Sequence, residues 1–191
     1  MADSIILFGG TFNPIHVAHV TIASRARSFV AAKEVLFMPT RQNPLKDSLA
    51  IPLHHRVTML KIATEHLPWA KVVLTTKQDD TATPDYTITT VENLYKERNF
   101  TEPPYLLIGE DLIATLPNWH RLDDLLQMVR LLIVSRSDQA CIACSYPHTA
   151  LVIPHLDIAS TTIRLNIDSA YQEQHLHPKV WEYIKRERLY C

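Results

Sequence analysis

The sequence contains few cysteines, no long apolar run and almost no excess of either charge. Three cysteines in 191 residues are too few, and odd in number, for a disulfide framework. The formal net charge is −1 with histidine neutral, so the composition does not predict a broad surface for nucleic acid or membranes. The apolar run from Ile5 to Phe8 is too short to span a bilayer, and residues 1–4 lack the basic segment of a secretory signal. We therefore expect a cytoplasmic protein that binds neither nucleic acid nor membrane.

The rest of the composition is that of a globular protein. Hydrophobic residues make up 47% of the chain and charged residues 20%, a balance that excludes general disorder. A length of 191 residues suffices for one well-cored domain and is short for two. No repeat, low-complexity tract or linker interrupts the sequence, so we predict a single domain over residues 1–191.

Short apolar runs rich in β-branched residues alternate with helical stretches. The runs lack strict polar alternation, as in strands covered on both faces of a parallel sheet. This order predicts an α/β fold with a doubly wound, Rossmann-like parallel sheet, helices on both faces, and ligands beyond the carboxyl ends of the strands. Thr89 and Glu92 fit a capping box near the start of the third helix. The predicted strands are Ile5–Phe8, Val35–Met38, Val72–Thr75, Leu106–Ile108, Leu131–Val134 and Leu151–Ile153, and the predicted helices are Ala18–Val30, His54–His66, Thr90–Arg98, Leu122–Met128, Thr161–Ile167 and Lys179–Arg188.

Two glycines and two histidines follow the first predicted strand. Residues 9–19 are GGTFNPIHVAH. The glycines let a ligand approach the main chain closely, and Pro14 suits a turn or the first position of a helix. His16 and His19, three residues apart, would project from one face of that helix. They would lie beside free N–H groups at a helix N-terminus, an environment that favours phosphate groups.

The histidine pair is also compatible with two roles besides phosphate binding. Histidines that follow a strand are often ordinary surface residues. A zinc site is the second possibility, but His16 and His19 supply only two ligands and no third carboxylate follows them. The glycine turn and the Asn13-Pro14 pair immediately before them favour phosphate binding over both.

A second polar segment follows the last predicted strand. Residues 157–164 are DIASTTIR. Hydroxyl residues at a helix start offer caps and leave several backbone donors pointing outward. Arg164 lies one turn further along, on the side of Ser160 and Thr161, and adds a planar cation for phosphate oxygens. Taken alone, this segment favours an ordinary capped helix with a solvated arginine over a phosphate site.

Further segments bear on a second ligand. Asp111, just after the strand at 106–108, can accept hydrogen bonds from ribose hydroxyls. Trp119 can offer a flat face to an aromatic ring, or it can seal the core. Residues 84–90 place hydroxyl groups near a helix start, or they form an ordinary loop and cap.

Both polar segments resemble motifs of the nucleotidyltransferase superfamily with the HxGH motif. Residues 10–19 are similar to its GTF[DN]PxHxGH signature, with Ala18 where glycine is usual. Residues 158–164 are similar to its ISSTx[IV]R segment, with Ala159 in place of the first serine. The resemblance implies that His16, His19 and Arg164 are catalytic and act on the ATP phosphates. The ATP-binding residues that it implies are Gly9, Gly10, Thr11, Phe12, Ala18, Lys46, Gly109, Asp111, Ser160 and Thr161.

The remaining segments resemble bacterial nicotinate-nucleotide adenylyltransferase. Residues 109–111 and 116–119 are similar to its GxD and LPxW segments. Residues 85–87 are similar to its SYT segment, with Asp85 in place of serine. The loop at 38–46, the helix at 55–59 and the tail at 176–184 also match, so the resemblance covers nearly the whole chain. The acceptor-binding residues that it implies are Asn13, Arg56, Tyr86, Thr87, Trp119 and His120.

The resemblance implies that the adenylyl group of ATP is transferred to nicotinate mononucleotide, giving nicotinate adenine dinucleotide and pyrophosphate in NAD biosynthesis. The 5′-phosphate of the acceptor is already a nucleophile, so positioning and electrostatic stabilisation suffice. Mg²⁺ would be carried by the ATP phosphates, without a metal site on the protein. The expected partners are therefore ATP and nicotinate mononucleotide, and whether the chain forms a homo-oligomer is left open.

Several alternatives remain open. A related enzyme could use nicotinamide mononucleotide, phosphopantetheine or a CTP-dependent acceptor, although the Pro117–Trp119 stretch argues against the phosphopantetheine enzyme. A non-catalytic nucleotide sensor is the alternative outside enzymes. Lys46 and Arg56 are cations of a type that is usually solvated, and the resemblance would place both near the phosphates. Cys141 and Cys144 form a CxxC without a second pair, which indicates thiols in a variable loop rather than a metal site.

Overall fold

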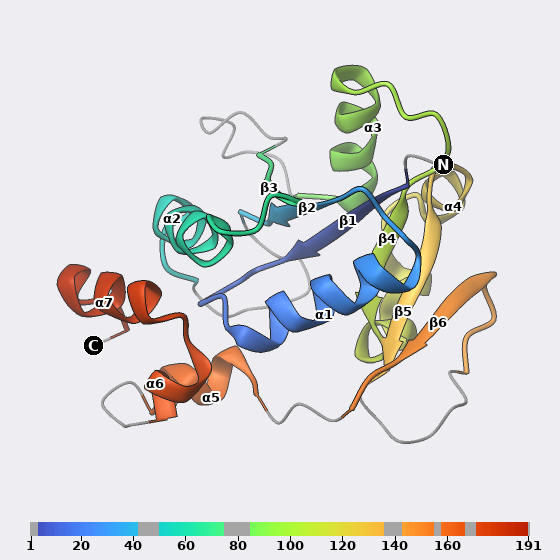
Figure 1. Cartoon of the computed structure of the whole chain (residues 1–191). Coiled ribbons are helices and arrows are strands. Elements are labelled where there is room, and N and C mark those ends of the chain that lie inside the picture. Colours follow the sequence, from blue (N-terminus) through green and yellow to red (C-terminus); the bar gives the residue numbers. More distant parts are fainter. Residues whose placement is uncertain are drawn as a thin grey trace.

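The computed structural model describes residues 4–41, 50–74, 85–135, 143–154, 158–166 and 171–190, and it has an α/β fold (Figure 1). Its strands are β1 (Ile5–Gly10), β2 (Glu34–Pro39), β3 (Ala70–Val72), β4 (Tyr105–Gly109), β5 (Arg130–Ser135) and β6 (His148–Val152). Its helices are α1 (Val17–Phe29), α2 (Leu53–Thr64), α3 (Thr87–Glu97), the 3₁₀ helix η1 (Glu110–Asn118), α4 (Leu122–Met128), α5 (Ser160–Leu165), α6 (Tyr171–His175) and α7 (Pro178–Glu187).

The six strands form one sheet in the order β3-β2-β1-β4-β5-β6, and every pairing between neighbours is parallel. This is the strand order of a doubly wound sheet, in which the direction of the connections reverses between β1 and β4. The predicted fold class is therefore confirmed. A ligand crevice is expected outside the carboxyl ends of these two strands.

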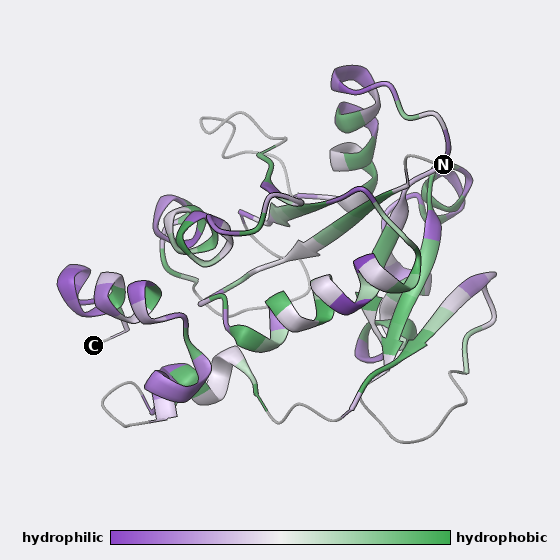
Figure 2. Ribbon diagram, viewed as in Figure 1, coloured by the Kyte–Doolittle hydropathy of each residue, from purple (hydrophilic) through white to green (hydrophobic). Residues whose placement is uncertain are grey.

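Successive residues of each central strand enter different hydrophobic cores. Ile6 and Phe8 of β1 pack in the core that α1, α2, α5 and α7 cover, whereas Leu7 packs in the core that α3, α4 and η1 cover. Figure 2 shows apolar residues along the central strands and polar residues on the outer sides of the helices. Because both faces are covered, both sets of strand side chains must be apolar, which explains the continuous apolar runs in the sequence.

The predicted elements are present with shifted ends. All six predicted strands and all six predicted helices occur, but β3 covers Ala70–Val72 rather than Val72–Thr75. The predicted capping box at Thr89 is wrong, because α3 already begins at Thr87. The earlier start buries Ile88 completely, and such packing outweighs local capping preferences. The elements η1 and α6 were not predicted, since both are short and η1 contains Pro117.

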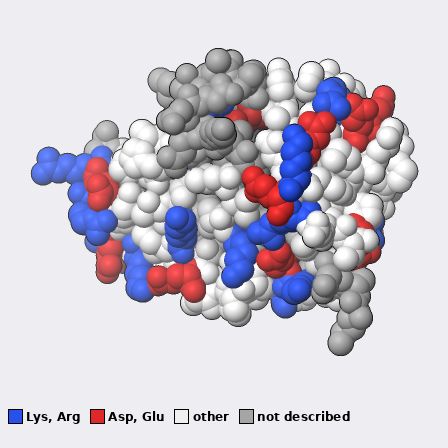
Figure 3. All heavy atoms as spheres, turned by 90° about the horizontal axis from the view of Figure 1, so that it is seen from above, with Lys and Arg blue, Asp and Glu red and all other residues white. Residues whose placement is uncertain are grey.

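The surface carries no large patch of one charge on the face shown in Figure 3, where basic and acidic side chains are interspersed. Within the described ranges, no helix is both long and apolar enough to cross a membrane.

Candidate active site

The segment between β1 and α1 is shaped by Gly10 and Phe12. Phe12 is buried and has a φ of 47°, in the left-handed region that non-glycine residues rarely adopt. Its ring packs edge-on against Phe8, with ring centroids 5.5 Å apart. A Cβ atom on Gly10 would lie only 3.0 Å from the Phe12 ring. A side chain at Gly10 would therefore press on this ring, and glycine also leaves the main chain accessible.

The two predicted catalytic histidines lie together at the N-terminus of α1. His16 is the N-cap residue, with extended backbone, and His19 lies in the first turn. Their ring centroids are 3.8 Å apart, and the main-chain N–H of His16 donates to Nδ1 of His19 at 3.3 Å. His16 is 6% exposed, and His19 packs against the Phe12 ring at 5.1 Å. This helix begins at Val17, one residue before its predicted start at Ala18.

The start of α5 packs directly on the segment that precedes the histidine pair. The Ser160 hydroxyl donates to the main-chain carbonyl of Pro14 at 3.0 Å. Arg164 donates from Nη1 to the carbonyl of Asn13 at 2.7 Å and from Nη2 to the Thr161 hydroxyl at 3.3 Å. The two motifs, far apart in the sequence, therefore meet, as the adjacent starts of α1 and α5 in Figure 1 also show.

A pocket of about 280 Å³ lies beyond the carboxyl ends of the central strands, at the position expected for a doubly wound sheet. The start of α3 and the 3₁₀ helix η1 form its outer walls. The structure thus brings together predicted residues from four separate segments. Those that line the pocket are Gly9, Gly10, Thr11, Tyr86, Thr87, Asp111, Trp119 and His120.

One end of this pocket is aromatic. The rings of Tyr86 and His120 stack with centroids 4.3 Å apart and an angle of 29°. Trp119 lines the same pocket, and its indole Nε1 donates to the Thr115 hydroxyl at 3.2 Å, which fixes the ring. Thr87, the first residue of α3, also borders the pocket. The positive end of that helix dipole favours a negative group there.

Asp85, which replaces a serine in the motif that the sequence resembles, is paired with Arg41. Its carboxylate accepts from the main-chain N–H of Arg41 and lies 3.4 Å from the Arg41 guanidinium. The Asp85 side chain is only 6% exposed. Because Arg41 balances this charge, a carboxylate at this position does not repel an anionic ligand as an isolated one would.

Arg56 is buried beneath the pocket rather than exposed in it. It is 1% exposed and donates to four main-chain carbonyls: Ile51 at 3.0 Å, Thr11 at 2.7 Å, Thr40 at 2.6 Å and Arg41 at 2.9 Å. Burial lowers its pKa, although an arginine stays charged. Four of the five N–H donors of this guanidinium bond to main-chain carbonyls, so the predicted direct contact with the acceptor stays a prediction for a side chain that the protein covers. Arg56 ties together the segments that follow β1 and β2.

Two other predicted ligand residues are also covered by protein. Ala18 is 1% exposed and Asn13 is 5% exposed, and neither lines the pocket. The side-chain oxygen of Asn13 accepts a hydrogen bond from the Tyr190 hydroxyl at 2.8 Å. Tyr190 was missed in the sequence, where nothing distinguished it from other tail residues.

Of the remaining residues that the sequence singled out, some lie in the described part of the structure and some lie outside it. Gly109 lies directly beneath the carboxylate of Asp111, so that a Cβ atom there would collide with it. Lys46 and Cys141 lie outside the described residues. Cys144 is a half-buried free thiol. Among the residues that the structure describes, no three His, Cys, Asp or Glu side chains are grouped closely enough to hold a metal ion.

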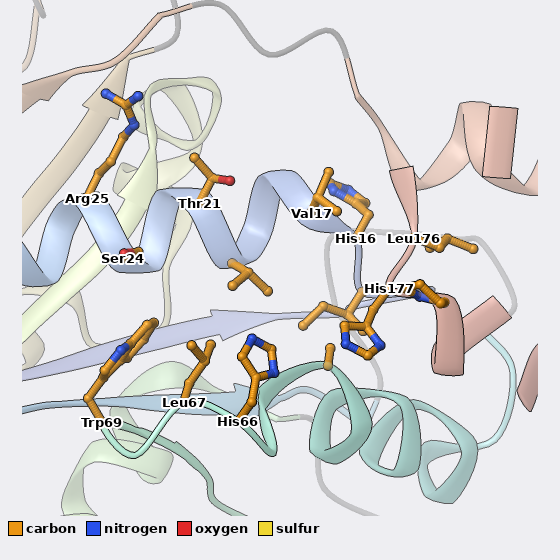
Figure 4. Close-up of a pocket in the computed structure, with 14 residues that line it drawn as sticks. His16, Val17, Thr21, Ser24, Arg25, His66, Leu67, Trp69, Leu176 and His177 are labelled. Carbon is orange, nitrogen blue, oxygen red and sulfur yellow. The ribbon is translucent and has the colours of Figure 1, made fainter. Parts of the chain in front are cut away.

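A second cavity, of about 490 Å³, lies along the flank of α1 (Figure 4). It is bordered by His16, by Trp69 and His66 near the end of α2, and by His177 before α7. The rings of His66 and His177 stack 5.7 Å apart. Gly9–Thr11 border the first pocket, and Ile15, His16 and Val17 border this cavity, so the motif segment contributes residues to both.

Comparison with known proteins decides the family. Residues 7–167 match the cytidylyltransferase-like family. The chain is 36% identical over 186 residues to a probable nicotinate-nucleotide adenylyltransferase of Bacillus pumilus, covering 96% of both chains. It is 34% identical over 186 residues to the protein of that name from Streptococcus pneumoniae serotype 4, covering 96% of this chain and 87% of the relative. This chain belongs to the nicotinate-nucleotide adenylyltransferase family.

Solved structures agree with this family assignment in fold. The nicotinic acid mononucleotide adenylyltransferase of Plasmodium falciparum, complexed with NaAD, superposes with a TM-score of 0.80. The match covers 98% of this chain and 97% of that one, at 19% sequence identity. The resemblance that the motifs indicated is therefore confirmed, and this nicotinate-nucleotide adenylyltransferase family member has the nucleotidyltransferase fold.

Proposed function

We propose that this chain transfers the adenylyl group of ATP to nicotinate mononucleotide, giving nicotinate adenine dinucleotide and pyrophosphate in NAD biosynthesis. One observation carries the proposal: the Gly9–Thr11 segment borders an aromatic-walled pocket and leads directly into a histidine pair whose preceding residues bond to the start of α5. The relatives in Bacillus and Streptococcus carry the name of this activity. We further propose that residues 1–191 act as one domain.

The pocket suits a pyridine ring that carries a negative group. The indole of Trp119 offers a flat surface for the ring, and the Tyr86–His120 stack closes the same end. Thr87 at the start of α3 would meet the carboxylate of the pyridine, which the helix dipole favours over a neutral amide. This arrangement supports nicotinate rather than nicotinamide mononucleotide as the acceptor.

The donor nucleotide would lie along the Gly9–Thr11 segment, which borders the same pocket, with its triphosphate toward the histidine pair. His16 and His19 would contact the triphosphate, and Ser160 and Thr161 would bind its outgoing part. Arg164 donates hydrogen bonds from Nη1 to Asn13 and from Nη2 to Thr161. Because a guanidinium carries five N–H donors, others remain for phosphate oxygens. On the pocket side, Asp111 would accept from ribose hydroxyls.

The chemistry requires alignment and charge stabilisation rather than a protein base. A phosphate monoester is a competent nucleophile at neutral pH, and an in-line displacement at the α-phosphorus develops negative charge that imidazoles and a guanidinium can stabilise. Mg²⁺ would arrive bound to the ATP phosphates and neutralise part of their charge. The protein would hold the two substrates so that the attacking and leaving oxygens lie in line.

A panel of acceptors, assayed with MgATP for pyrophosphate release, tests this proposal. Nicotinate mononucleotide should give the highest kcat/KM, nicotinamide mononucleotide a lower value, and 4′-phosphopantetheine none above a blank without acceptor. A higher value for nicotinamide mononucleotide would overturn the acceptor assignment. Tight ATP binding with no pyrophosphate release from any acceptor would overturn the enzyme assignment in favour of a nucleotide sensor.

A further inference from the structure

The chain turns back on itself after α7. Arg188 has a φ of 50° and Tyr190 a φ of 67°, both in the left-handed region that side-chain-bearing residues rarely adopt. Leu189, between them, is buried in the core beside α7, and its main-chain N–H donates to the Ile184 carbonyl at 3.1 Å. Packing of this leucine holds the unusual backbone and directs the Tyr190 side chain toward the molecule.

Tyr190 reaches the segment that precedes the histidine pair. Its hydroxyl donates to Oδ1 of Asn13 at 2.8 Å, across 177 positions of sequence. Burial raises the pKa of Tyr190 well above its usual range, although the guanidiniums of Arg164 and Arg56 oppose the rise. The phenol therefore stays protonated at neutral pH and remains a hydrogen-bond donor.

Asn13 is held from two sides. Its main-chain carbonyl accepts from Arg164, and its side-chain oxygen accepts from Tyr190. It is 5% exposed, so loss of either donor would leave a covered oxygen without that bond, which disfavours the present position of the residue. Asn13 lies three residues before His16, and any movement would pass to both the histidine pair and Arg164.

We propose that Tyr190 is a positioning residue for adenylyl transfer, which acts through Asn13 on the histidine pair and Arg164; this inference rests on the proposed function. Tyr190 does not line the acceptor pocket. Its loss should therefore disturb the geometry of the reacting phosphates more than the binding of the pyridine ring, and lower kcat with little change in the KM for nicotinate mononucleotide.

The first test compares Tyr190→Phe with Tyr183→Phe. The Tyr183 hydroxyl lies 2.8 Å from Nδ1 of His55 on α2, so the control variant also loses one side-chain hydrogen bond from the C-terminal part of the chain. We expect Tyr190→Phe to lower kcat roughly tenfold, as losses of outer-shell support commonly do, with the acceptor KM within about twofold of the parent. Tyr183→Phe should lower the melting temperature without this loss of kcat.

A double-mutant cycle with Asn13→Ala identifies the path of the effect. If Tyr190 acts through Asn13, the double variant should be no slower than Asn13→Ala alone, because the bond is already absent. Should Tyr190→Phe fail to fold, Asn13→Ala removes the same bond from its other end and is compared with Tyr183→Phe in the same way.

Three results would overturn the inference. The first is a kcat for Tyr190→Phe within twofold of that of the parent. The second is a decrease in kcat in Tyr183→Phe equal to that in Tyr190→Phe. The third is a decrease in kcat in the double variant equal to the product of the decreases in the two single variants. These results differ from failure of the proposed function, in which the parent protein itself releases no pyrophosphate with any acceptor.

Discussion

The guanidinium of Arg164 donates a hydrogen bond to the main-chain carbonyl of Asn13 at 2.7 Å, between residues 151 positions apart. Arg164 lies in α5, which follows the edge strand β6, and Asn13 follows β1 at the centre of the sheet. Together with the bond from Ser160 to Pro14, this contact joins two separate motifs at the place where we propose that the ATP phosphates bind. Substitutions in that site and in the pocket beside it should therefore have separable effects on turnover and on acceptor binding.

Trp119 should control affinity for the acceptor but not for ATP. Replacement by leucine removes the flat surface on which the pyridine ring would stack, an interaction typically worth about 1 kcal/mol beyond its buried area. We expect the KM for nicotinate mononucleotide to rise about tenfold, while the KM for ATP changes less than about twofold. Steady-state kinetics with each substrate varied in turn measures both values.

Trp69→Leu is the matched control for this prediction. Trp69 borders the cavity along α1 rather than the acceptor pocket (Figure 4). Its replacement should leave the acceptor KM unchanged. A similar rise in the acceptor KM of both variants would show that a general loss of packing, and not the loss of ring stacking, causes the effect.

Gly109 should be required for the position of the Asp111 carboxylate. A Cβ atom at Gly109 would collide with that carboxylate, so Gly109→Ala must displace it. We expect the KM for ATP to rise by a similar factor in Gly109→Ala and Asp111→Ala, because the first displaces and the second removes the same acceptor for ribose hydroxyls. The KM for ATP of the double variant should be no higher than that of either single variant. If the increases in KM of the two single variants multiply in the double variant, Gly109 has a role other than positioning the Asp111 carboxylate.

Ala159→Ser should stabilise the protein. Ala159 is the N-cap residue of α5 and has the extended backbone typical of that position, but its methyl group cannot cap the helix. A serine hydroxyl there typically adds about 1 kcal/mol, which corresponds to a rise of roughly 2–4 °C in melting temperature for a chain of this size. Thermal unfolding followed by circular dichroism measures the shift. An unchanged or lower melting temperature would show that the hydroxyl cannot reach the helix N–H groups.

The sheet was predictable from sequence because strands buried on both faces leave continuous apolar runs. Leu36 and Phe37 of β2 illustrate this, since they are adjacent in sequence but pack in opposite cores. The end of β3 and the start of α3 were less predictable. Burial of Ile88 against the sheet moved the helix start to Thr87, and no local signal encodes that contact.

The site was predictable where local motifs carry the chemistry, and not where long-range packing does. The motifs predicted that the two histidines lie close together and that Tyr86, Trp119 and His120 share a site, and the structure shows the histidine rings side by side and those three residues in one pocket, while their roles stay predictions. The sequence predicted Arg56 as a residue that contacts the acceptor, but it did not predict that the side chain would be buried and bonded to main-chain carbonyls of segments that only the fold brings together. Tyr190 gave no signal at all, because its partner Asn13 is 177 positions away.

Turnover of His19→Ala with saturating MgATP and nicotinate mononucleotide tests the central claim most directly. If His19 stabilises the transferring phosphoryl group, kcat should fall about 10²- to 10³-fold, as for other preorganised donors, with the melting temperature close to that of the parent. His54→Ala, at an exposed position on α2, should retain parental turnover. Near-normal turnover in a folded His19→Ala protein would contradict the account.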